Sequence, residues 1–254
     1  DASEVYETVS ELRKRHPAAR HIAGGTHVEH NQGRCAEVFD AIVLGTAEEE
    51  MIGAVGLATG MRSLDHATGH HPFCDYAHPD RSFLPPERIA GHEHFKQHGG
   101  LVGTGVQFSR GCAFRCNFCI YNTPNVFDFR TPEQITAEIL YLKREYGVEA
   151  VNLRDEVCLP VQQKTCRAFL EASGNAGVKW RGQTVPFAPE ELVKLAAESG
   201  CVSMFVGLES IVEESIDETN KPFNRVPQYE REIKCFHDHG IMLKGPHFYD
   251  CSVR

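Results

Sequence analysis

Three cysteines stand close together in the sequence, and their spacing indicates a metal centre. Cys112, Cys116 and Cys119 form a CxxxCxxC pattern, and on a tight loop this spacing lets three thiolates converge. Thiolate is the soft ligand that zinc and iron–sulfur clusters select. A structural zinc site is normally closed by four protein ligands, and no fourth cysteine or histidine follows at close spacing. A cubane cluster held by three cysteines keeps one iron open for another ligand, and the pattern favours this interpretation.

The overall composition argues against two classes of partner. The 254 residues carry a formal net charge of −9, whereas a nucleic-acid-binding surface needs a basic patch. No apolar run approaches the roughly 18 residues that span a bilayer. Hydrophobic residues make up 41% of the chain, which is enough to build a core. We therefore expect a globular protein whose partners include neither nucleic acid nor membrane.

The remaining cysteines are scattered singly, at positions 35, 74, 158, 166, 201, 235 and 251. That distribution suits a reducing compartment better than a disulfide framework, so we expect a cytoplasmic protein. The first residues, Asp1 to Glu4, lack the basic head and apolar stretch of a signal peptide. Because no initiating methionine is present, we expect the chain to be processed or to be part of a longer protein.

Residues 1–57 predict a short segment of alternating helices and strands. Apolar residues at helical spacing predict a helix over 3–16. The short stretch 20–23 and the apolar run 41–44 predict two strands, which end in glycine turns at Gly24-Gly25 and at Gly45. A further helix is expected over 47–55. This order is typical of an α/β segment with parallel strands.

Residues 58–104 predict a linker. The segment is rich in histidine, and four prolines between positions 72 and 86 would break any long element. His94 and His98 could share one helical face, but the residues between them lack the glutamate of a HExxH zinc site.

Residues 105–254 predict a partial parallel (β/α) barrel. Thr131, Pro132 and Gln134 form a strong helix start, with Thr131 as N-cap and Gln134 completing a capping box. Strands are expected at 106–108, 150–153, 178–181, 202–206 and 241–244, and one helix is expected between each pair of consecutive strands, at 131–147, 161–173, 189–199 and 227–239. This alternation favours an α/β fold with right-handed crossovers.

Polar residues follow the ends of these strands. In a barrel of this kind the carboxyl ends of the strands gather around the active site. The candidates there are Asp155 and Glu156 after the second strand, Gln183 and Thr184 after the third, Glu209 and Ser210 after the fourth, and His247 after the fifth. The cysteine loop follows the first strand. We therefore expect these side chains to face a common site.

The cysteine stretch resembles the radical SAM superfamily, and in particular its cobalamin-associated branch. The resemblance rests on CxxxCxxC with Phe118 before the last cysteine, on the preceding Ser109-Arg110-Gly111 and on the following Ile120-Tyr121. It implies that the three cysteines hold a [4Fe–4S] cluster whose open iron is chelated by S-adenosylmethionine (SAM). An electron from the cluster then cleaves the sulfonium to give a 5′-deoxyadenosyl radical. The family's fold is a partial barrel of six strand–helix units, and only five strands are expected here, so the resemblance implies a barrel truncated at its C-terminus.

The same resemblance assigns cofactor contacts to several residues. Asp155-Glu156 would receive the SAM ammonium, the Gly207–Ser210 segment with Glu209 and Ser210 would contact the ribose and carboxylate, and Phe118 would lie near the adenine. Gln183 is a further candidate cofactor contact. Asp155 and Glu209 could instead be turn residues. Tyr121, Lys221 and His247 are weaker candidates, and no catalytic residue is assigned.

Residues 1–57 resemble the closing half of the cobalamin-binding Rossmann-like domain of that branch. The family pattern is a Gly-Gly-x-His turn, here Gly24, Gly25 and His27, followed by a strand that ends Gly-Glu-x-Glu. Gly45 and Glu48 match the second pattern, whereas Thr46 replaces its first glutamate. The segment is too short for a complete domain of this type. The glycines therefore either contact cobalamin or mark tight turns beneath a parallel sheet.

Taken together, the sequence predicts a radical SAM enzyme. A cobalamin-dependent methyl transfer to an unactivated carbon of a small molecule or peptide is the first hypothesis, with flavodoxin or ferredoxin as electron donor. A non-methylating dehydratase, epimerase or oxidative cyclase of the same branch is the second. A non-catalytic iron–sulfur or zinc-binding module is the alternative from another class.

Overall fold

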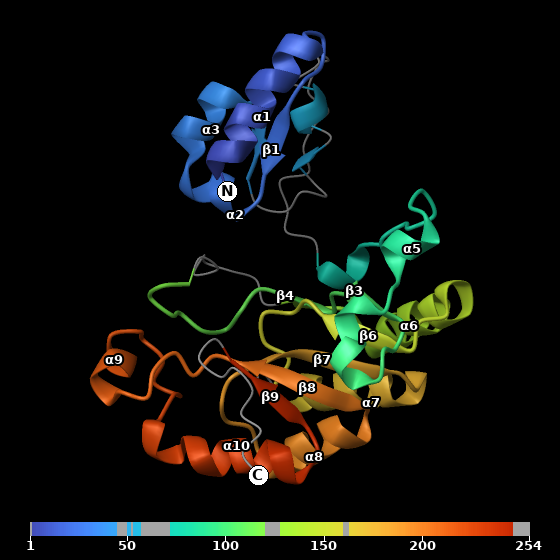
Figure 1. Cartoon of the computed structure of the whole chain (residues 1–254), viewed down its shortest axis with the longest axis vertical. Helices are drawn as coiled ribbons and strands as arrows, with labels where there is room; N and C mark the ends of the chain where they lie inside the picture. Colours follow the sequence, from blue (N-terminus) through green and yellow to red (C-terminus); the bar gives the residue numbers. More distant parts are fainter. Residues whose placement is uncertain are drawn as a thin grey trace. The chain divides into compact units, whose positions relative to one another are not determined.

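A computed structural model gives the arrangement of the chain (Figure 1). It describes residues 2–44, 50–51, 53–56, 72–119, 128–159 and 163–245. The chain divides into two compact units, residues 1–70 and residues 71–254. Within the described residues, no helix is long and apolar enough to cross a bilayer.

The first unit is a small α/β segment. Its elements are α1 (Ala2–Arg15), β1 (Ile22–Gly24), α2 (Thr26–His30), α3 (Gln32–Val38) and β2 (Ala41–Val43). Strands β1 and β2 pair in parallel, with Ile22 opposite Ala41. The predicted first helix and both predicted strands are confirmed, and the two short helices between the strands were not expected. Residues 50–51 and 53–56 are helical, and the rest of the predicted helix 47–55 lies outside the described residues.

The second unit is built on a five-stranded parallel sheet. Its strands are β3 (Gly103–Val106), β6 (Ala150–Leu153), β7 (Lys179–Thr184), β8 (Cys201–Val206) and β9 (Met242–Lys244), in that spatial order. The predicted α/β fold with a partial parallel barrel is confirmed. The first strand begins at Gly103 rather than at Val106. A Cβ at Gly103 would lie 2.3 Å from the ring of Phe95, so glycine at this position lets Phe95 pack against the strand. In the sequence, Gly103 and Gly105 resemble a turn rather than the start of a strand.

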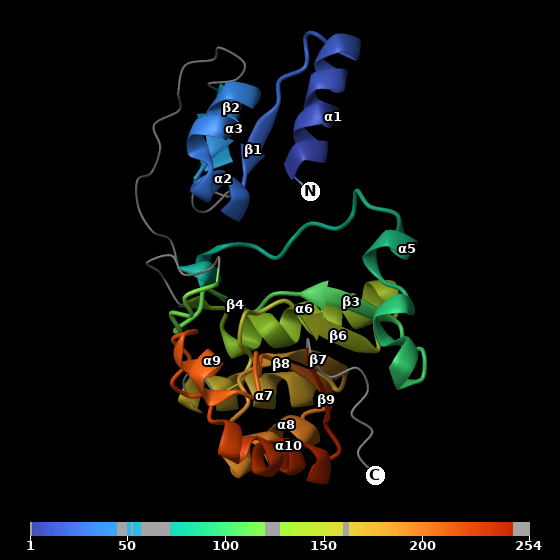
Figure 2. The same ribbon diagram turned by 60° about the vertical axis from the view of Figure 1, so that its left-hand side comes forward.

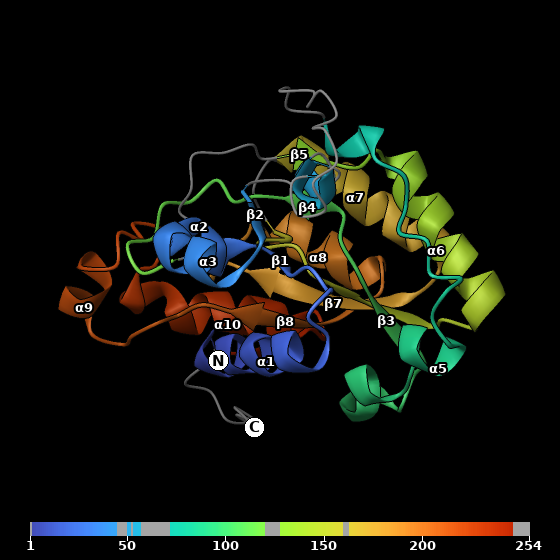
Figure 3. The same cartoon turned by 90° about the horizontal axis from the view of Figure 1, so that it is seen from above.

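Helices pack on one face of this sheet (Figures 2 and 3). They are α6 (Pro132–Tyr146), α7 (Gln163–Ala176), α8 (Glu190–Glu198) and α10 (Tyr229–Asp238). The shorter α9 (Glu213–Asp217) and η3 (Val226–Gln228) precede α10 in the chain. The predicted capping box of α6 is present: Gln134 N donates to Thr131 Oγ1, and Thr131 N donates to Gln134 Oε1. Trp180, Leu170 and Leu192 are fully buried in the core between helices and sheet.

The described part of the expected linker is packed rather than solvated. Residues 72–102 form η1 (Phe73–Asp75), α5 (Pro86–Ile89) and η2 (Glu93–His98). Phe73, Ile89 and Phe95 are buried. The apolar residues of this segment recur with neither helical nor strand spacing, so the hydrophobic pattern could not predict that the segment is buried.

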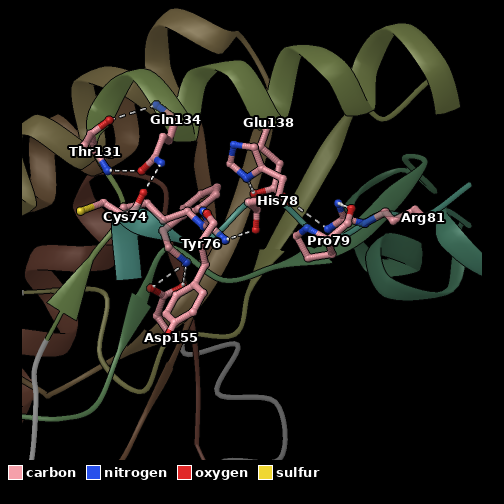
Figure 4. A network of polar contacts seen from close by, with 12 residues as sticks. Cys74, Tyr76, His78, Pro79, Arg81, Thr131, Gln134, Glu138 and Asp155 are labelled. Atoms are coloured by element: carbon pink, nitrogen blue, oxygen red, sulfur yellow. Dashed lines mark hydrogen bonds and ion pairs between the residues drawn. The ribbon is translucent and has the colours of Figure 1, made fainter. Parts of the chain in front are cut away.

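Residues 73–81, which we call the docking segment, bind to the start of α6 (Figure 4). Glu138 is 2% exposed, and its oxygens lie 2.8 Å from Arg81 Nη2 and 2.9 Å from His78 Nδ1. Gln134 Nε2 donates to the carbonyl oxygen of Cys74 at 2.6 Å. Polar side chains of the first strand–helix unit therefore hold the docking segment in place.

Candidate active site

The cysteine loop starts from a short hairpin. Strand β4 (Ser109–Arg110) precedes the loop, β5 (Asp128–Phe129) follows it, and the two pair antiparallel. Gly111 adopts a left-handed conformation with φ 84°, which glycine takes without steric cost. Cys119 N donates to Cys116 O at 3.0 Å and closes a turn between two of the cysteines. The loop is described as far as Cys119.

The three cysteines of the motif line one cavity of about 220 Å³. Burial raises the pKa of the Cys112 and Cys116 thiols, while the positive charge of Lys221 lowers both values. Among the described residues, no three His, Cys, Asp or Glu side chains gather closely enough to hold a single metal ion. In a cubane cluster each thiolate binds a different iron. A cluster of this type therefore accommodates thiolates that are further apart than the ligands of a single metal ion.

Asp155 faces the start of the cysteine loop rather than the cavity. It is 4% exposed, and its carboxylate accepts hydrogen bonds from Phe108 N at 3.2 Å, from Ser109 Oγ at 2.5 Å and from Ser109 N. Burial raises the pKa of Asp155 to about 6, although these hydrogen bonds partly oppose the rise. Asp155 lines a separate cavity of about 340 Å³ that none of the three cysteines lines. Its contacts fix the strand that leads into the loop, which differs from the SAM contact expected from the sequence.

Glu156, the next residue, does line the cysteine cavity. Burial raises the pKa of Glu156, and the neighbouring charge of Asp155 raises it further. Its Oε2 atom is buried and has no hydrogen-bond partner among the described residues. A buried carboxylate oxygen without a donor is costly unless a ligand supplies one. Of the two predicted carboxylates, Glu156 is therefore the one that lines the cavity of the three cysteines.

Glu209 and Lys221 form an ion pair in the same cavity. Their Oε1 and Nζ atoms are 2.5 Å apart, and the Glu209 backbone is left-handed with φ 63°. A Cβ at Gly207 would lie 2.5 Å from the Glu209 oxygen and 2.8 Å from the Lys221 nitrogen. These two atoms are the ends of flexible side chains, and they place the pair close against the Gly207 backbone at the end of β8. Lys221 Nζ also stands 5.4 Å from the centre of the Phe118 ring.

Two side chains from the following segment hold the turn that carries Glu209. Asn224 Nδ2 donates to the carbonyl oxygens of Gly207 and Leu208 at 2.9 and 3.0 Å. The hydroxyl of Tyr229 donates to the same Leu208 oxygen at 3.0 Å. Both side chains are buried, so the turn after β8 is rigidly anchored. These anchors were not predicted, because a single amide or hydroxyl contact leaves no repeating pattern in the sequence.

An amide clamp joins the cysteine loop to the segment after α9. Asn117 N donates to Thr219 O at 3.0 Å, and Asn117 Nδ2 donates to Glu218 O at 3.0 Å. In the opposite direction, Asn220 Nδ2 donates to Arg115 O at 2.6 Å. The clamp thus connects segments about a hundred residues apart in sequence, and we refer to it below as the asparagine clamp.

Of the other predicted site residues, a few line the cavity, others lie elsewhere in the structure, and some lie outside the described residues. Phe118, which is 59% exposed, and Gln183 both line the cavity. Ser210 Oγ accepts a hydrogen bond from Val212 N at 3.0 Å and so belongs to the turn after Glu209. Gly45, Tyr121 and His247 lie outside the described residues. Lys221, only a weaker candidate in the sequence, is brought into the centre of the site.

The glycine turn of the first unit follows β1. Gly25 has φ 91° and begins α2, and a Cβ at Gly24 would lie 3.2 Å from Cβ of Val43 on the neighbouring strand. His27 accepts or donates a hydrogen bond with the Tyr6 hydroxyl at 2.8 Å. These contacts explain the glycines by backbone conformation and close strand packing.

The family follows from the sequence of the second unit. The profile of the Radical SAM superfamily matches residues 106–242, which is more than half of the chain. The chain belongs to the radical SAM superfamily, whose members are enzymes that use a [4Fe–4S] cluster and SAM.

Two methyltransferases illustrate what the chain is similar to. It is 26% identical over 237 residues to bacteriochlorophyllide d C-12(1)-methyltransferase of Chlorobaculum tepidum, covering 88% of this chain and 49% of the relative. It is 28% identical over 158 residues to cytidylyl-2-hydroxyethylphosphonate methyltransferase of Streptomyces wedmorensis, covering 58% of this chain and 29% of the relative. The chain spans half or less of the length of these relatives.

Solved structures share the fold of the chain. The radical SAM methyltransferase TsrM from Kitasatospora setae, solved with tryptophan and a SAM analogue, aligns with a TM-score of 0.70 at 16% identity, covering 96% of this chain and 52% of that one. The cobalamin-dependent radical SAM enzyme OxsB aligns with a TM-score of 0.65 at 13% identity, covering 96% and 38%. Both alignments extend over nearly the whole of this chain.

The residues of the cavity fit the cofactors of the family. The soft thiols of Cys112, Cys116 and Cys119 suit an iron–sulfur cluster. The partnerless oxygen of Glu156 suits an ammonium donor. When bound, the cluster supplies the electron that cleaves the sulfonium of SAM.

Proposed function

We propose that this chain is part of a radical SAM methyltransferase that uses cobalamin and modifies an unactivated carbon of a small molecule or peptide. The observation that carries the proposal is the cavity where the three cysteines, the partnerless oxygen of Glu156 and the Glu209–Lys221 pair meet. The names of the relatives, both methyltransferases, support methyl transfer. The likeness to cobalamin-dependent structures over 96% of the chain supports cobalamin.

The residues of the chain divide the work in this proposal. The cysteines hold the cluster, and Glu156 accepts hydrogen bonds from the SAM ammonium. The Glu209–Lys221 pair presents one negative and one positive group to the ribose and carboxylate side of SAM. Phe118 and Phe205 line the same cavity and exclude water beside the adenine. A flavodoxin or ferredoxin of a reducing cytoplasm supplies the electron.

The cysteine assignment is tested by iron content. Replacing Cys112, Cys116 or Cys119 by alanine should abolish cluster retention, because each thiolate holds a different iron. Cys35→Ala and Cys235→Ala are matched controls outside the motif, and they should keep the iron content of the parent. Equal iron loss in all five variants would show that the ligands lie elsewhere.

The reaction type is tested by spectrum and products. Anaerobically purified protein should absorb broadly near ~400 nm, and dithionite should bleach this band. With cobalamin, reductant and substrate, methyl transfer yields S-adenosylhomocysteine together with a methylated product. A featureless spectrum with bound zinc would contradict the enzyme proposal. We expect this chain alone to bind cobalamin weakly. Stoichiometric cobalamin in the purified protein would contradict this expectation of weak binding.

A non-methylating reaction is the second candidate. The chain is 25% identical over 155 residues to the anaerobic magnesium-protoporphyrin IX monomethyl ester cyclase of Synechocystis, covering 58% of this chain and 30% of the relative. A cyclase would consume SAM to 5′-deoxyadenosine without forming S-adenosylhomocysteine. The ratio of the two products decides between the candidates.

A further inference from the structure

The face of the sheet turned away from the helices, which we call the inner face, is polar. Paired residues in register lie on the same face of a sheet. One row across the inner face holds Gly105, Asn152, Arg181, Ser203 and Met242. The next row holds Gln183, Phe205 and Lys244, with Arg154 just beyond the end of β6. The interior of a parallel barrel is normally filled by branched apolar side chains, so this composition indicates a ligand rather than a core.

Two arginines dominate the inner face. Arg181 Nε donates to Asn152 Oδ1 at 3.1 Å, and its guanidinium lies 5.1 Å from the centre of the Phe95 ring. Arg154 passes over Gly105, where a Cβ would lie 3.4 Å from Arg154 Nε. Neither arginine forms an ion pair with a carboxylate of the described residues.

The positive groups of the inner face repel one another. Burial, and then the charge of Arg154, lower the pKa of Arg181. Burial likewise lowers the pKa of His98, and the charges of Lys244 and Arg181 lower it further. His98 Nε2 lies 3.2 Å from Ser203 Oγ, which places it on the inner face. In a chain of net charge −9, such a local excess of cations is unfavourable until an anion binds.

The inner face continues into the cysteine cavity. Gln183 and Phe205 line that cavity and also belong to the second row of the inner face. A molecule that extends from the cavity along the sheet would therefore meet Arg154 first and Arg181 one row further in.

We propose that Arg154 and Arg181 bind an anionic group of the substrate, a carboxylate or a phosphate. The planar guanidinium matches both groups with two parallel hydrogen bonds, and two such groups on adjacent strands match an anion between them. The inference rests on the proposed function, because the substrate is the molecule whose carbon receives the methyl group.

The test measures anion binding by the full chain. The probes are inorganic phosphate and acetate, titrated by calorimetry with and without S-adenosylhomocysteine. The parent should bind at least one probe saturably. Arg154→Gln and Arg181→Gln should each weaken binding about tenfold or more, since each removes a charged hydrogen-bonding group. Arg144→Gln removes a 71% exposed arginine of α6 and should leave binding unchanged. Preference for phosphate or acetate tells which anion is taken.

A stability measurement separates this role from a structural one. Arg181→Gln removes a charge that burial and Arg154 disfavour, so its thermal midpoint should equal or exceed that of the parent. If that variant fails to fold, the structural role is supported and the proposal fails for Arg181. Arg154 is exposed, so Arg154→Gln gives an independent result.

Three results would overturn the proposal: no saturable binding by the parent, equal loss in Arg144→Gln, or displacement of the probe by S-adenosylhomocysteine. The last result would assign the anion to the cofactor's own carboxylate. Anion binding requires neither cluster nor methyl transfer. A protein that binds the anion without cleaving SAM would therefore refute only the proposed function, and a methylating protein that binds no anion would refute only this inference.

Discussion

The Nζ atom of Lys221 lies 2.5 Å from Oε1 of Glu209, and the two atoms lie 2.8 and 2.5 Å from the position that a Cβ at Gly207 would take. The pair brings a positive charge into the cavity that three cysteines line. Burial raises the pKa of Cys112 and Cys116, and the charge of Lys221 offsets part of this rise. Lys221 therefore acts on the electrostatics of the cavity as well as on Glu209.

Replacing Lys221 by methionine should make a reconstituted cluster harder to reduce. Removal of a nearby cation raises the cost of adding an electron, and the reduction potential should fall by on the order of 50–100 mV. Potentiometric titration followed by electron paramagnetic resonance measures the change. Lys194→Met, on an exposed lysine of α8, is the control, and an equal potential in both variants would remove this role from Lys221.

Replacing Glu156 by glutamine should weaken SAM binding without loss of iron. The substitution keeps the shape and removes a charge-assisted hydrogen bond of roughly 1.5–3 kcal/mol, which corresponds to about ten- to a hundredfold in affinity. Equilibrium binding of SAM to the clustered variant measures the effect. Glu213→Gln, at the start of α9, is the matched control; if a fully clustered Glu156→Gln keeps the parent's affinity, the SAM ammonium is held elsewhere.

Asp155 should make the stability of the cluster-free protein depend on pH. Its folded pKa of about 6 is raised above the ordinary value of 3.8, so its protonated form favours the folded state. That contribution is fully present below pH 3.8, and it is lost as the pH rises through 6. The rise from 3.8 to about 6 corresponds to roughly 3 kcal/mol.

Urea unfolding at pH 4 to 7 checks this dependence. The free energy of unfolding of the parent, measured relative to that of Asp155→Asn, should decrease across this range, because the amide does not titrate. A constant difference between the two proteins would show that Asp155 keeps the same ionisation in the folded and unfolded states.

Replacing Glu138 by glutamine should release the docking segment. The carboxylate is buried against Arg81 and His78, and loss of one partner of a buried pair costs about 3–5 kcal/mol. We expect a lower unfolding midpoint and faster proteolysis within residues 73–81. Glu145→Gln removes a half-exposed partner of Arg144, and its cost should stay within about 1 kcal/mol. Similar losses in the two variants would mean that the pair with Arg81 adds no stability.

The order of strands and helices in the barrel could be predicted because apolar residues recur at characteristic spacings in buried strands and amphipathic helices. The sequence also predicted the start of α6 from Thr131 and Gln134, whose contacts are local. The docking segment was missed because its stability comes from single contacts across the sequence. The centre of the Phe73 ring, for example, lies 4.3 Å from the Arg110 guanidinium and 4.4 Å from that of Arg130. Such stacking leaves no repeating pattern in the sequence.

The site was predicted at the level of loops rather than of atoms. Asp155 and Glu156 are adjacent, and which of them faces the cavity depends on how the chain leaves β6. The structure directs Asp155 to Ser109 and Glu156 to the cysteines. Lys221 reaches the cavity in its ion pair with Glu209, and a single contact of this kind leaves no pattern in the sequence.

The asparagine clamp also bears on the order in which a newly made chain becomes competent for its metal. Asn117 is held by Thr219 and Glu218, and Arg115 by Asn220, so the loop gains these restraints only after residue 220 has left the ribosome. Contacts of such long sequence separation form late because the intervening chain must first be ordered. Iron delivered while only the motif has emerged would meet three cysteines on an unrestrained segment. The loop can therefore hold the restrained conformation described here only after the fourth barrel strand has been synthesised.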